Sequence, residues 1–342
     1  VNPQEFLIKK YIFGDCVYQI GSLTQDYVNN GLHDLRHIRG SQNHAFLQFT
    51  LQNAGLNDIF LLRNFIHLQR VDISGNALLT LEPLGNLRQL KELYASKNFL
   101  KDALDFSPPE GLQVVDLSKN QISCIERCKL HPYLQELYLQ GNFIESVDGI
   151  FCHNTCLKIL DLSNNRISSL RGITGEEQMQ LEKLSLSTNK LQDLVGIEKL
   201  KFLRTLVAHD NQLNTLQGIT AAHHPYLQQI ELEQNKIESL ESLIPLKDLR
   251  YLRALNFLQC PLQMIPFYRL SIIHLFQKLT ILDNQPITAE EKVLVDRAYG
   301  CEMYFHQQRW NEFLPGIPFA DPRIITEKKI KRTQNIINCM LE

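Results

Sequence analysis

The sequence lacks the features that mark membrane and secreted proteins. It has no run of about 20 uncharged apolar residues, since Arg269 and Lys278 interrupt its most apolar stretch, so no membrane span is expected. It has no Asn-x-Ser/Thr glycosylation site, and its eight cysteines are spread over 342 residues. Together these absences favour reduced thiols and a cytoplasmic location over a disulfide framework.

The sequence also lacks an excess of charge and any recognised catalytic motif. There are 35 Lys plus Arg against 37 Asp plus Glu, so no strong field would attract nucleic acid. No Gly-x-x-x-x-Gly-Lys-Ser/Thr loop, His-Glu-x-x-His helix or Gly-x-Ser-x-Gly turn occurs. We therefore expect a protein that is not an enzyme, without catalytic residues or a cofactor.

What the sequence has instead is a repeated frame, Leu-x-x-apolar-x-apolar-x-x-Asn. The frame ends on an asparagine in eight segments and on Cys260 in a ninth; the asparagines are Asn76, Asn98, Asn120, Asn142, Asn165, Asn189, Asn211 and Asn235. Successive ends are 22 to 25 residues apart, which is the period of leucine-rich repeats. One such coil cannot bury its apolar face alone, so the frame predicts an α/β solenoid of stacked coils with short parallel strands on its concave face.

The asparagine of each coil is expected to turn inward after the strand. Its amide can pair with backbone groups of adjacent coils that would otherwise be buried without partners. A thiol hydrogen-bonds only weakly, so Cys260 should support this ladder poorly and mark the last coil before a cap. The cysteines of two Cys-x-x-x-Cys pairs, Cys124 with Cys128 and Cys152 with Cys156, occupy different offsets in their repeats, so no metal site is expected.

Three regions follow from where the frame begins and ends. Residues 1–45 lack it and are predicted to form a largely helical N-terminal cap that covers the first coil. Residues 46–285 form the solenoid with its closing coil, beginning with a degenerate repeat that has Ala54 in the asparagine slot. Residues 286–342 should contain a cap helix, begun by the capping-box pair Thr288 and Glu291, and then an extended anchoring tail.

Several stretches resemble known families. The 22-residue repeats with Gly-Ile turns resemble the leucine-rich-repeat class typified by the regulatory subunit of type-1 protein phosphatase. Residues 58–68, 106–112, 252–262 and 287–293 are similar to the repeat region of the leucine-rich-repeat and guanylate-kinase proteins. The first of these stretches is also similar to leucine-rich proteins of the axonemal radial spokes. The resemblance covers roughly residues 50–295, and it implies a role in protein interactions and, through the axonemal relatives, a place in the cilium or flagellum.

Two surfaces are candidates for partner binding. The outward slots of the strands predict an acidic and aromatic stripe on the concave face, formed by Arg70, Asp72, Glu92, Tyr94, Asp116, Glu136, Tyr138, Asp161 and Lys183. Tyrosine gives a large contact area at little entropic cost, and carboxylates beside it select a basic partner. The same residue types also suit solvent-facing strand slots without any partner. The tail offers Trp310, Phe313, Lys328, Lys329, Lys331 and Arg332, whose basic run suits an acidic protein surface, an anionic membrane or plain solvent.

Two main functions compete at this point. The first is a structural adaptor of the ciliary axoneme, whose concave face and tail bind other proteins such as tubulin, dynein or spoke components. The second is a soluble regulatory subunit that docks on a phosphatase. A third hypothesis makes these residues the targeting region of a longer protein with a guanylate-kinase-like domain.

Overall fold

A computed structural model describes residues 10–13, 16–19, 21–38, 43–148, 150, 154–173 and 179–299. The chain divides into two compact units, and each is described by itself. Unit 1 comprises Val1–Ile167 and Gly172–Leu181, and unit 2 comprises Ser168–Arg171 and Glu182–Glu342. The tail residues predicted to bind a partner, from Trp310 onward, lie outside the described residues.

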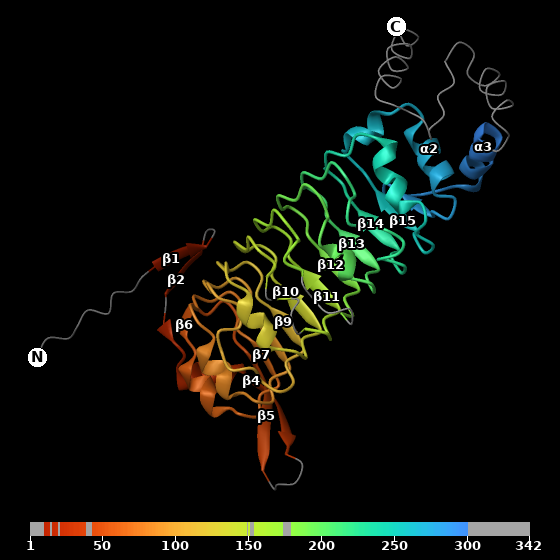
Figure 1. Ribbon diagram of the computed structural model, residues 1–342. Helices are drawn as coiled ribbons and strands as arrows, with labels where there is room; N and C mark the ends of the chain where they lie inside the picture. Colours follow the sequence, from red (N-terminus) through yellow and green to blue (C-terminus); the bar gives the residue numbers. More distant parts are fainter. Residues whose placement is uncertain are drawn as a thin grey trace, which may run out of the picture. The chain divides into compact units, whose positions relative to one another are not determined.

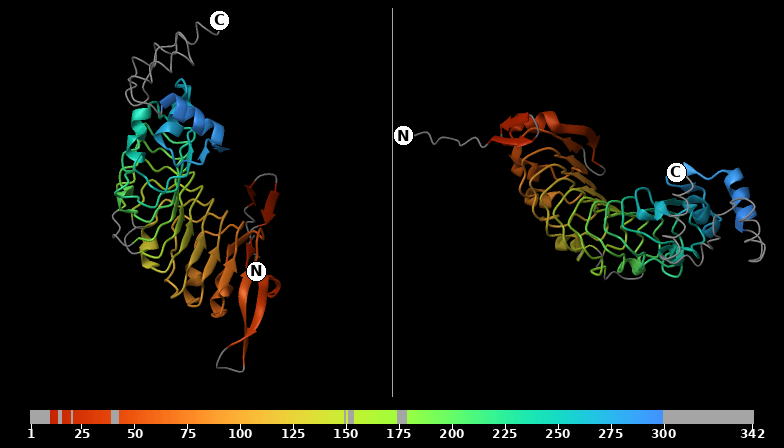
Figure 2. Two further views of the ribbon diagram at one scale, coloured as in Figure 1. Left: turned by 90° about the vertical axis from the view of Figure 1, so that its right-hand side faces the viewer. Right: turned by 90° about the horizontal axis from the view of Figure 1, so that it is seen from above.

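Unit 1 is built mainly from short strands joined by turns and 3-10 helices (Figure 1). Its strands are β1 (Lys10–Phe13), β2 (Cys16–Gln19), β3 (Gly21–Ser22), β4 (Leu32–His37), β5 (His44–Thr50), β6 (Leu56–Asp58), β7 (Arg70–Asp72), β8 (Glu92–Tyr94), β9 (Val114–Asp116), β10 (Glu136–Tyr138) and β11 (Ile159–Asp161). Its helices are α1 (Gln25–Gly31), η1 (Phe60–Asn64), η2 (Glu82–Asn86) and η3 (Glu126–Leu130). Strands β5 and β7 to β11 pair in parallel, each in register with the next (Figure 2).

Unit 2 continues the same pattern and ends in two α-helices. Its strands are β12 (Lys183–Ser185), β13 (Thr205–Val207), β14 (Gln229–Glu231), β15 (Ala254–Asn256), β16 (Ile281–Leu282) and β17 (Gln285–Pro286). Its helices are η4 (Ile197–Lys199), η5 (Leu240–Leu246), η6 (Pro261–Met264), α2 (Tyr268–Leu275) and α3 (Ala289–Tyr299). Strands β12 to β16 are parallel, and β17 turns back antiparallel to β16.

The apolar positions of the frame form the core of each unit. In the coil that contains β10, Leu134, Leu137 and Leu139 are all completely buried. Alternation along a three-residue strand places the middle side chain inside and the flanking side chains on the sheet face. The predicted assignment of inward and outward slots is therefore confirmed in the described coils of unit 1.

The asparagines form the predicted ladder. Asn98 is 1% exposed, and its Nδ2 donates to the carbonyls of Ala95, at 3.1 Å in its own coil, and Ile73, at 3.1 Å in the preceding coil. Its Oδ1 accepts the backbone N–H of Leu78 at 3.1 Å. In unit 2, Asn211 makes the equivalent bonds to its own and the preceding coil. One side chain thus satisfies backbone groups of two coils, which a leucine in the same slot could not do.

The prediction of a largely helical N-terminal cap was wrong for the described residues. Residues 10–38 contain one seven-residue helix, α1, together with the β1–β2 hairpin and strands β3 and β4. Strand β4 pairs antiparallel with β5, which pairs in parallel with β7. The physical reason is that the first coil exposes unpaired backbone N–H and C=O groups as well as an apolar edge, and a strand satisfies those groups where a helix cannot.

The C-terminal end of the array is closed much as predicted. Cys260 is buried in the ninth slot, where its Sγ donates one hydrogen bond, 3.1 Å long, to the carbonyl of Leu232. The thiol therefore replaces only part of what an asparagine supplies. Thr288 and Glu291 form the predicted capping box before α3, with reciprocal bonds of 2.9 and 3.2 Å.

A buried histidine in unit 1 departs from the apolar pattern. His131 is 2% exposed, and its ring lies edge-on to that of Phe106, with the ring centroids 5.6 Å apart. Neither ring nitrogen of His131 has a hydrogen-bond partner among the described residues. Burial penalises the imidazolium and lowers the pKa of His131 from 6.5 to about 4. The ring is thus neutral in the folded protein near neutral pH.

We expect Asn142→Leu to destabilise unit 1 sharply. The substitution leaves the carbonyls of Leu117 and Leu139 and the N–H of Ile122 without the partners they now have. At about 1 to 3 kcal/mol for each orphaned group, the loss should be at least about 3 kcal/mol in denaturant unfolding. Glu145→Leu, at an exposed site, is the matched control. A loss of under about 1 kcal/mol for Asn142→Leu would contradict the ladder's energetic role.

Acid should destabilise the protein through His131. Above pH 6.5 the ring is neutral in both states, whereas between 6.5 and about 4 the unfolded chain binds a proton that the folded one does not, so stability falls. The full effect is roughly 3 kcal/mol. His131→Leu should flatten this part of the curve of unfolding free energy against pH. Equal curves for His131→Leu and the wild type would refute the assignment.

Candidate functional site

The predicted stripe lies on the sheet face of unit 1, except for its last member. The first residues of β7 to β11 align in one column and the third residues in another. The charged and tyrosine members of these columns are Arg70, Asp72, Glu92, Tyr94, Asp116, Glu136, Tyr138 and Asp161, and we call them the acidic–aromatic strip. Strands about 4.8 Å apart give the strip a length of roughly 20 Å. Lys183, the predicted ninth member, is exposed on β12 in unit 2.

The three aspartates of the strip also hold the turns that follow their strands. The Oδ1 atoms of Asp72, Asp116 and Asp161 accept the N–H of the residue two positions on, at 3.1, 2.9 and 2.9 Å. Such bonds explain why aspartate suits this slot even without a partner. Each carboxylate still presents negative charge to the sheet face, because a hydrogen bond from a backbone N–H does not neutralise it.

The two tyrosines are held in place by the glutamates on their own strands. The hydroxyl of Tyr94 donates to Glu92 at 3.2 Å, and that of Tyr138 donates to Glu136 at 2.9 Å. Burial, then the hydrogen bond and the charge of Glu136, raise the pKa of Tyr138 to about 12. Burial and Glu92 raise the pKa of Tyr94 as well. Both rings are therefore neutral, oriented hydrogen-bond donors at any physiological pH.

The charge of the strip is uneven along its length. At the β7 end, Arg70 forms an ion pair with Glu92 at 2.8 Å and lies over the ring of Tyr94 at 4.8 Å. The β9 to β11 end carries Asp116, Glu136 and Asp161, and the strip has no cation there. Five carboxylates against one guanidinium give the strip a net charge of −4. This arrangement favours a basic ligand, with its strongest attraction toward β11.

Histidine, cysteine and acidic side chains are scattered rather than clustered in the part of the chain that the structure describes. No group of three or more His, Cys, Asp or Glu side chains there could hold a metal ion. Cys124 is exposed, whereas Cys128 is buried, and burial raises the pKa of the Cys128 thiol to about 12. None of the described helices is long and apolar enough to cross a bilayer.

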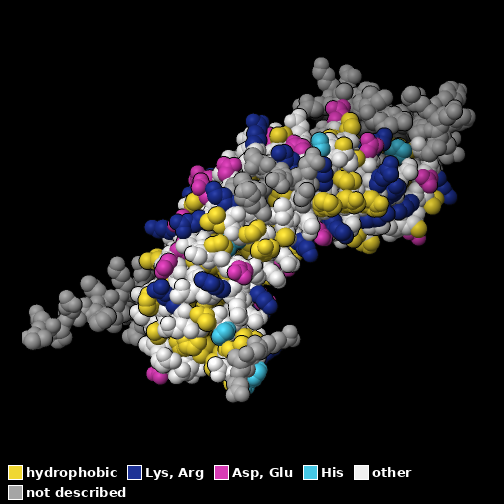
Figure 3. All heavy atoms as spheres, turned by 60° about the horizontal axis from the view of Figure 1, so that its bottom comes forward, with side chains coloured by type: hydrophobic (Ala, Val, Ile, Leu, Met, Phe, Trp, Pro, Cys, Tyr) yellow, Lys and Arg dark blue, Asp and Glu magenta, His cyan; other side chains and the backbone are white. Residues whose placement is uncertain are grey.

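A second group of exposed side chains was not predicted from the sequence. Phe202, Tyr226 and Tyr251 occupy the same slot in successive coils of unit 2, three residues before the strand, and form a row. Figure 3 shows hydrophobic side chains gathered on unit 2 and bordered by lysines and arginines. The signal is present in the sequence, as an aromatic residue immediately before the first leucine of three successive repeats.

Comparison with protein families matches residues 151–309 to the family described as Leucine-rich repeat. The chain has the leucine-rich-repeat fold, and this family model covers just under half of it. Leucine-rich repeat-containing protein 23 of Bos taurus is 35% identical over 193 residues, which are 55% of this chain and 54% of that protein. The chain thus spans about half the length of this curated relative. A solved internalin of Listeria monocytogenes has a TM-score of 0.59 at 20% identity, with 72% of this chain and 71% of that chain covered, and shows the shared fold.

Two shorter matches come from proteins with more specific names. The Leucine-rich repeat and guanylate kinase domain-containing protein of Homo sapiens is 36% identical over 93 residues, 27% of this chain and 11% of that protein. The Protein phosphatase 1 regulatory inhibitor subunit PPP1R7 homolog of Arabidopsis thaliana is 33% identical over 95 residues, 28% of each chain. Leucine-rich-repeat domains are typically non-enzymatic and mediate protein–protein interactions through extended surfaces.

We expect Glu136→Gln to lower the pKa of Tyr138 from about 12 toward 10, because it removes the charge that disfavours the phenolate. The measurement is a titration of ¹³C-labelled tyrosine rings by NMR in the alkaline range. Glu145→Gln, at an exposed site outside the strip, is the control and should leave Tyr138 unchanged. An unaltered Tyr138 pKa in Glu136→Gln would show that the two side chains are not coupled.

Proposed function

We propose that this chain is a non-enzymatic scaffold that binds a basic segment of a partner protein through the acidic–aromatic strip of unit 1. The observation that carries the proposal is the combination of net negative charge with two tyrosines fixed by hydrogen bonds. Charge complementarity speeds encounter and selects the partner, and the tyrosine rings supply contact area.

The strip is prepared for binding before a partner arrives. Tyr138 is already oriented by Glu136, and Arg70 by Glu92 and Tyr94 together. A side chain that is ordered in the free protein loses little rotamer entropy on binding, and that loss otherwise costs about 0.5 to 1.5 kcal/mol for each side chain. A lysine or arginine of the partner would meet the Asp116, Glu136 and Asp161 end, where no strip cation competes.

We place the scaffold in the cytoplasm, as an adaptor of the ciliary or flagellar axoneme with tubulin, dynein or spoke components as partners. The support is the resemblance of residues 58–68 to leucine-rich proteins of the radial spokes. The predicted tail residues Trp310, Phe313, Lys328, Lys329, Lys331 and Arg332 would supply a second attachment.

A second candidate is a regulatory subunit of a protein phosphatase. Its support is the similarity to the phosphatase regulatory subunit homologue of Arabidopsis thaliana. In this function the same strip would face the catalytic subunit. A third candidate, the targeting region of a protein with a guanylate-kinase-like domain, has the similarity to the human protein of that name as its support.

The experiment places a photo-cross-linking residue at Val114, which lies between Glu92 and Glu136 on the sheet face. The full chain that carries it is incubated with demembranated cilia. Mass spectrometry should identify links to tubulin, dynein or spoke components. Asp116→Lys with Glu136→Lys should reduce these links about tenfold or more, equivalent to about 1.4 kcal/mol. The matched change Glu82→Lys with Glu110→Lys, at exposed sites outside the strip, should preserve them.

Other results would redirect the assignment. Links only to a phosphatase catalytic subunit would favour the regulatory-subunit function. Equal links in the strip variant and its control would remove the strip from the binding surface.

A further inference from the structure

Three aromatic rings in unit 2 form an ordered row on the surface, which we call the aromatic ladder. The ring centroids of Phe202 and Tyr226 are 6.0 Å apart at an interplanar angle of 4°, and those of Tyr226 and Tyr251 are 6.4 Å apart at 21°. The strand register fixes this spacing, because Thr205, Gln229 and Ala254 begin paired strands and each ring lies three residues earlier. The ladder is thus a product of the repeat.

The ladder is exposed although its residues are large. Phe202, Tyr226 and Tyr251 are 42%, 46% and 51% exposed. Single exposed hydrophobic residues need no explanation, but contiguous rows of them mark interaction sites. The fourth coil places Lys278 in the same slot, so the row ends in a cation.

Basic side chains border the ladder. Arg204 and Arg253 occupy the slot two residues after Phe202 and Tyr251, and Lys201 and Arg250 immediately precede the same rings. Arg204 is paired with Glu182 at 3.3 Å, and Arg253 donates to the carbonyl of Lys278 at 3.1 Å.

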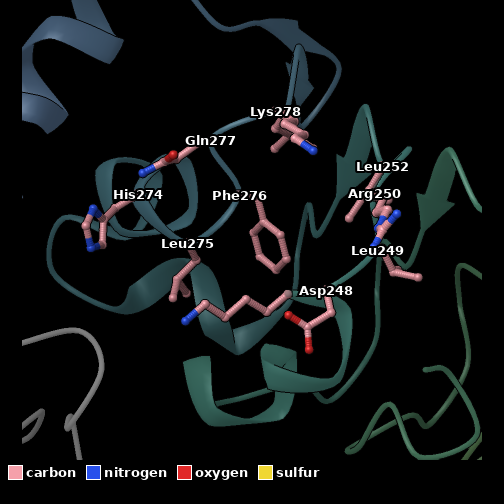
Figure 4. A pocket seen from close by; sticks show the side chains of 11 residues that line it. Asp248, Leu249, Arg250, Leu252, His274, Leu275, Phe276, Gln277 and Lys278 are labelled. Atoms are coloured by element: carbon pink, nitrogen blue, oxygen red, sulfur yellow. The ribbon is translucent and has the colours of Figure 1, made fainter. Parts of the chain in front are cut away.

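A pocket of about 410 Å³ is lined by Arg250 and Leu252, the chain neighbours of Tyr251, and by Lys278 at the cationic end of the ladder. Its lining includes Lys247, Arg250 and Lys278 against one carboxylate, that of Asp248. In Figure 4 the ring of Phe276 lies between Asp248 and Gln277 in the lining of this pocket. The Phe276 side chain is buried. The ladder and pocket together thus present six basic residues. Glu182 pairs with Arg204, and Asp248 is the carboxylate of the pocket lining.

We infer that the aromatic ladder and this pocket form a second docking surface, which binds an acidic segment of a partner protein. The acidic side chains contact the arginines and enter the pocket, and apolar side chains of the segment pack along the rings. The inference goes beyond the proposed function because the surface belongs to unit 2 and has the opposite charge to the acidic–aromatic strip.

The stacking of the rings decides between a peptide and a nucleic acid. Single-stranded nucleic acids bind by stacking bases on open aromatic faces. In the ladder, neighbouring rings already stack on one another, so Tyr226 has a ring on each side and offers a partner its edge rather than an open face. Aromatic edges carry partial positive charge, and a phenol donates a hydrogen bond, so both features suit carboxylates.

The test selects a phage-displayed library of random peptides on the full chain and measures the binding of the winners by fluorescence anisotropy. We expect the winners to be enriched in Asp and Glu and to contain aromatic or leucine residues. Tyr226→Ala with Tyr251→Ala, and separately Arg250→Glu with Lys278→Glu, should each weaken binding at least tenfold.

Matched controls lie in unit 1. Tyr133→Ala removes an exposed tyrosine from the same repeat slot, and Arg88→Glu with Lys91→Glu repeats the charge change at exposed sites. Both should bind the winners like the wild type. Asp116→Lys with Glu136→Lys should also leave this binding intact, so failure of this inference and failure of the proposed function are distinguishable.

Four outcomes would overturn the inference. One is a set of winners without acidic enrichment, and another is equal binding to the wild type and the ladder variants. The third is an oligodeoxythymidylate that binds the wild type more tightly than the best peptide and loses affinity in the same variants. Self-association of the wild type that both ladder variants abolish would assign the surface to a second copy of the chain instead.

Discussion

The structure depends on how each coil hides its polar backbone. A stack of short strands buries carbonyls and N–H groups at every turn, and those groups need partners. The asparagine amide supplies them to its own coil and to its predecessor, as Asn98 does for Ala95 and Ile73. Because the asparagine ladder occupies only inward-facing positions, the outward-facing positions can hold the side chains that a partner requires. The strip of unit 1 and the ladder of unit 2 both use that freedom.

The repeat could be predicted from the sequence because the residues at its fixed positions are compatible with few other local structures. The leucines at 134, 137 and 139 and the asparagine at 142 suit one local structure, and the capping box of Thr288 and Glu291 is similarly specific. The N-terminal region was harder to predict, since it has no repeat and its strands form only against the coil beside them. Strand β4 is defined by its pairing with β5, which no local pattern reveals.

The candidate site shows the same division between local and cooperative features. The columns of the strip follow from strand alternation, so its members could be identified from the sequence. Its internal organisation could not, because the bond from Tyr138 to Glu136 and the position of Arg70 over Tyr94 depend on rotamers chosen in the packed sheet. The aromatic ladder could be predicted in part. Its slots recur in the sequence, but the stacking of Phe202 on Tyr226 appears only when the coils are placed side by side.

The edge strand β4 affects whether two copies of the protein can associate end to end, which is a risk for any protein built from stacked repeats. A row of coils is chemically close to a fibre, since an open end can recruit the matching end of another molecule. Strand β4 runs opposite to the parallel strands behind it and carries exposed His33, Arg36 and His37, with Arg36 paired to the partly buried Asp34 at 2.7 Å. An incoming coil would meet reversed polarity and hydrated charge in place of a matching strand. The reversed strand direction and the charged side chains of this edge therefore disfavour end-to-end pairing of two copies.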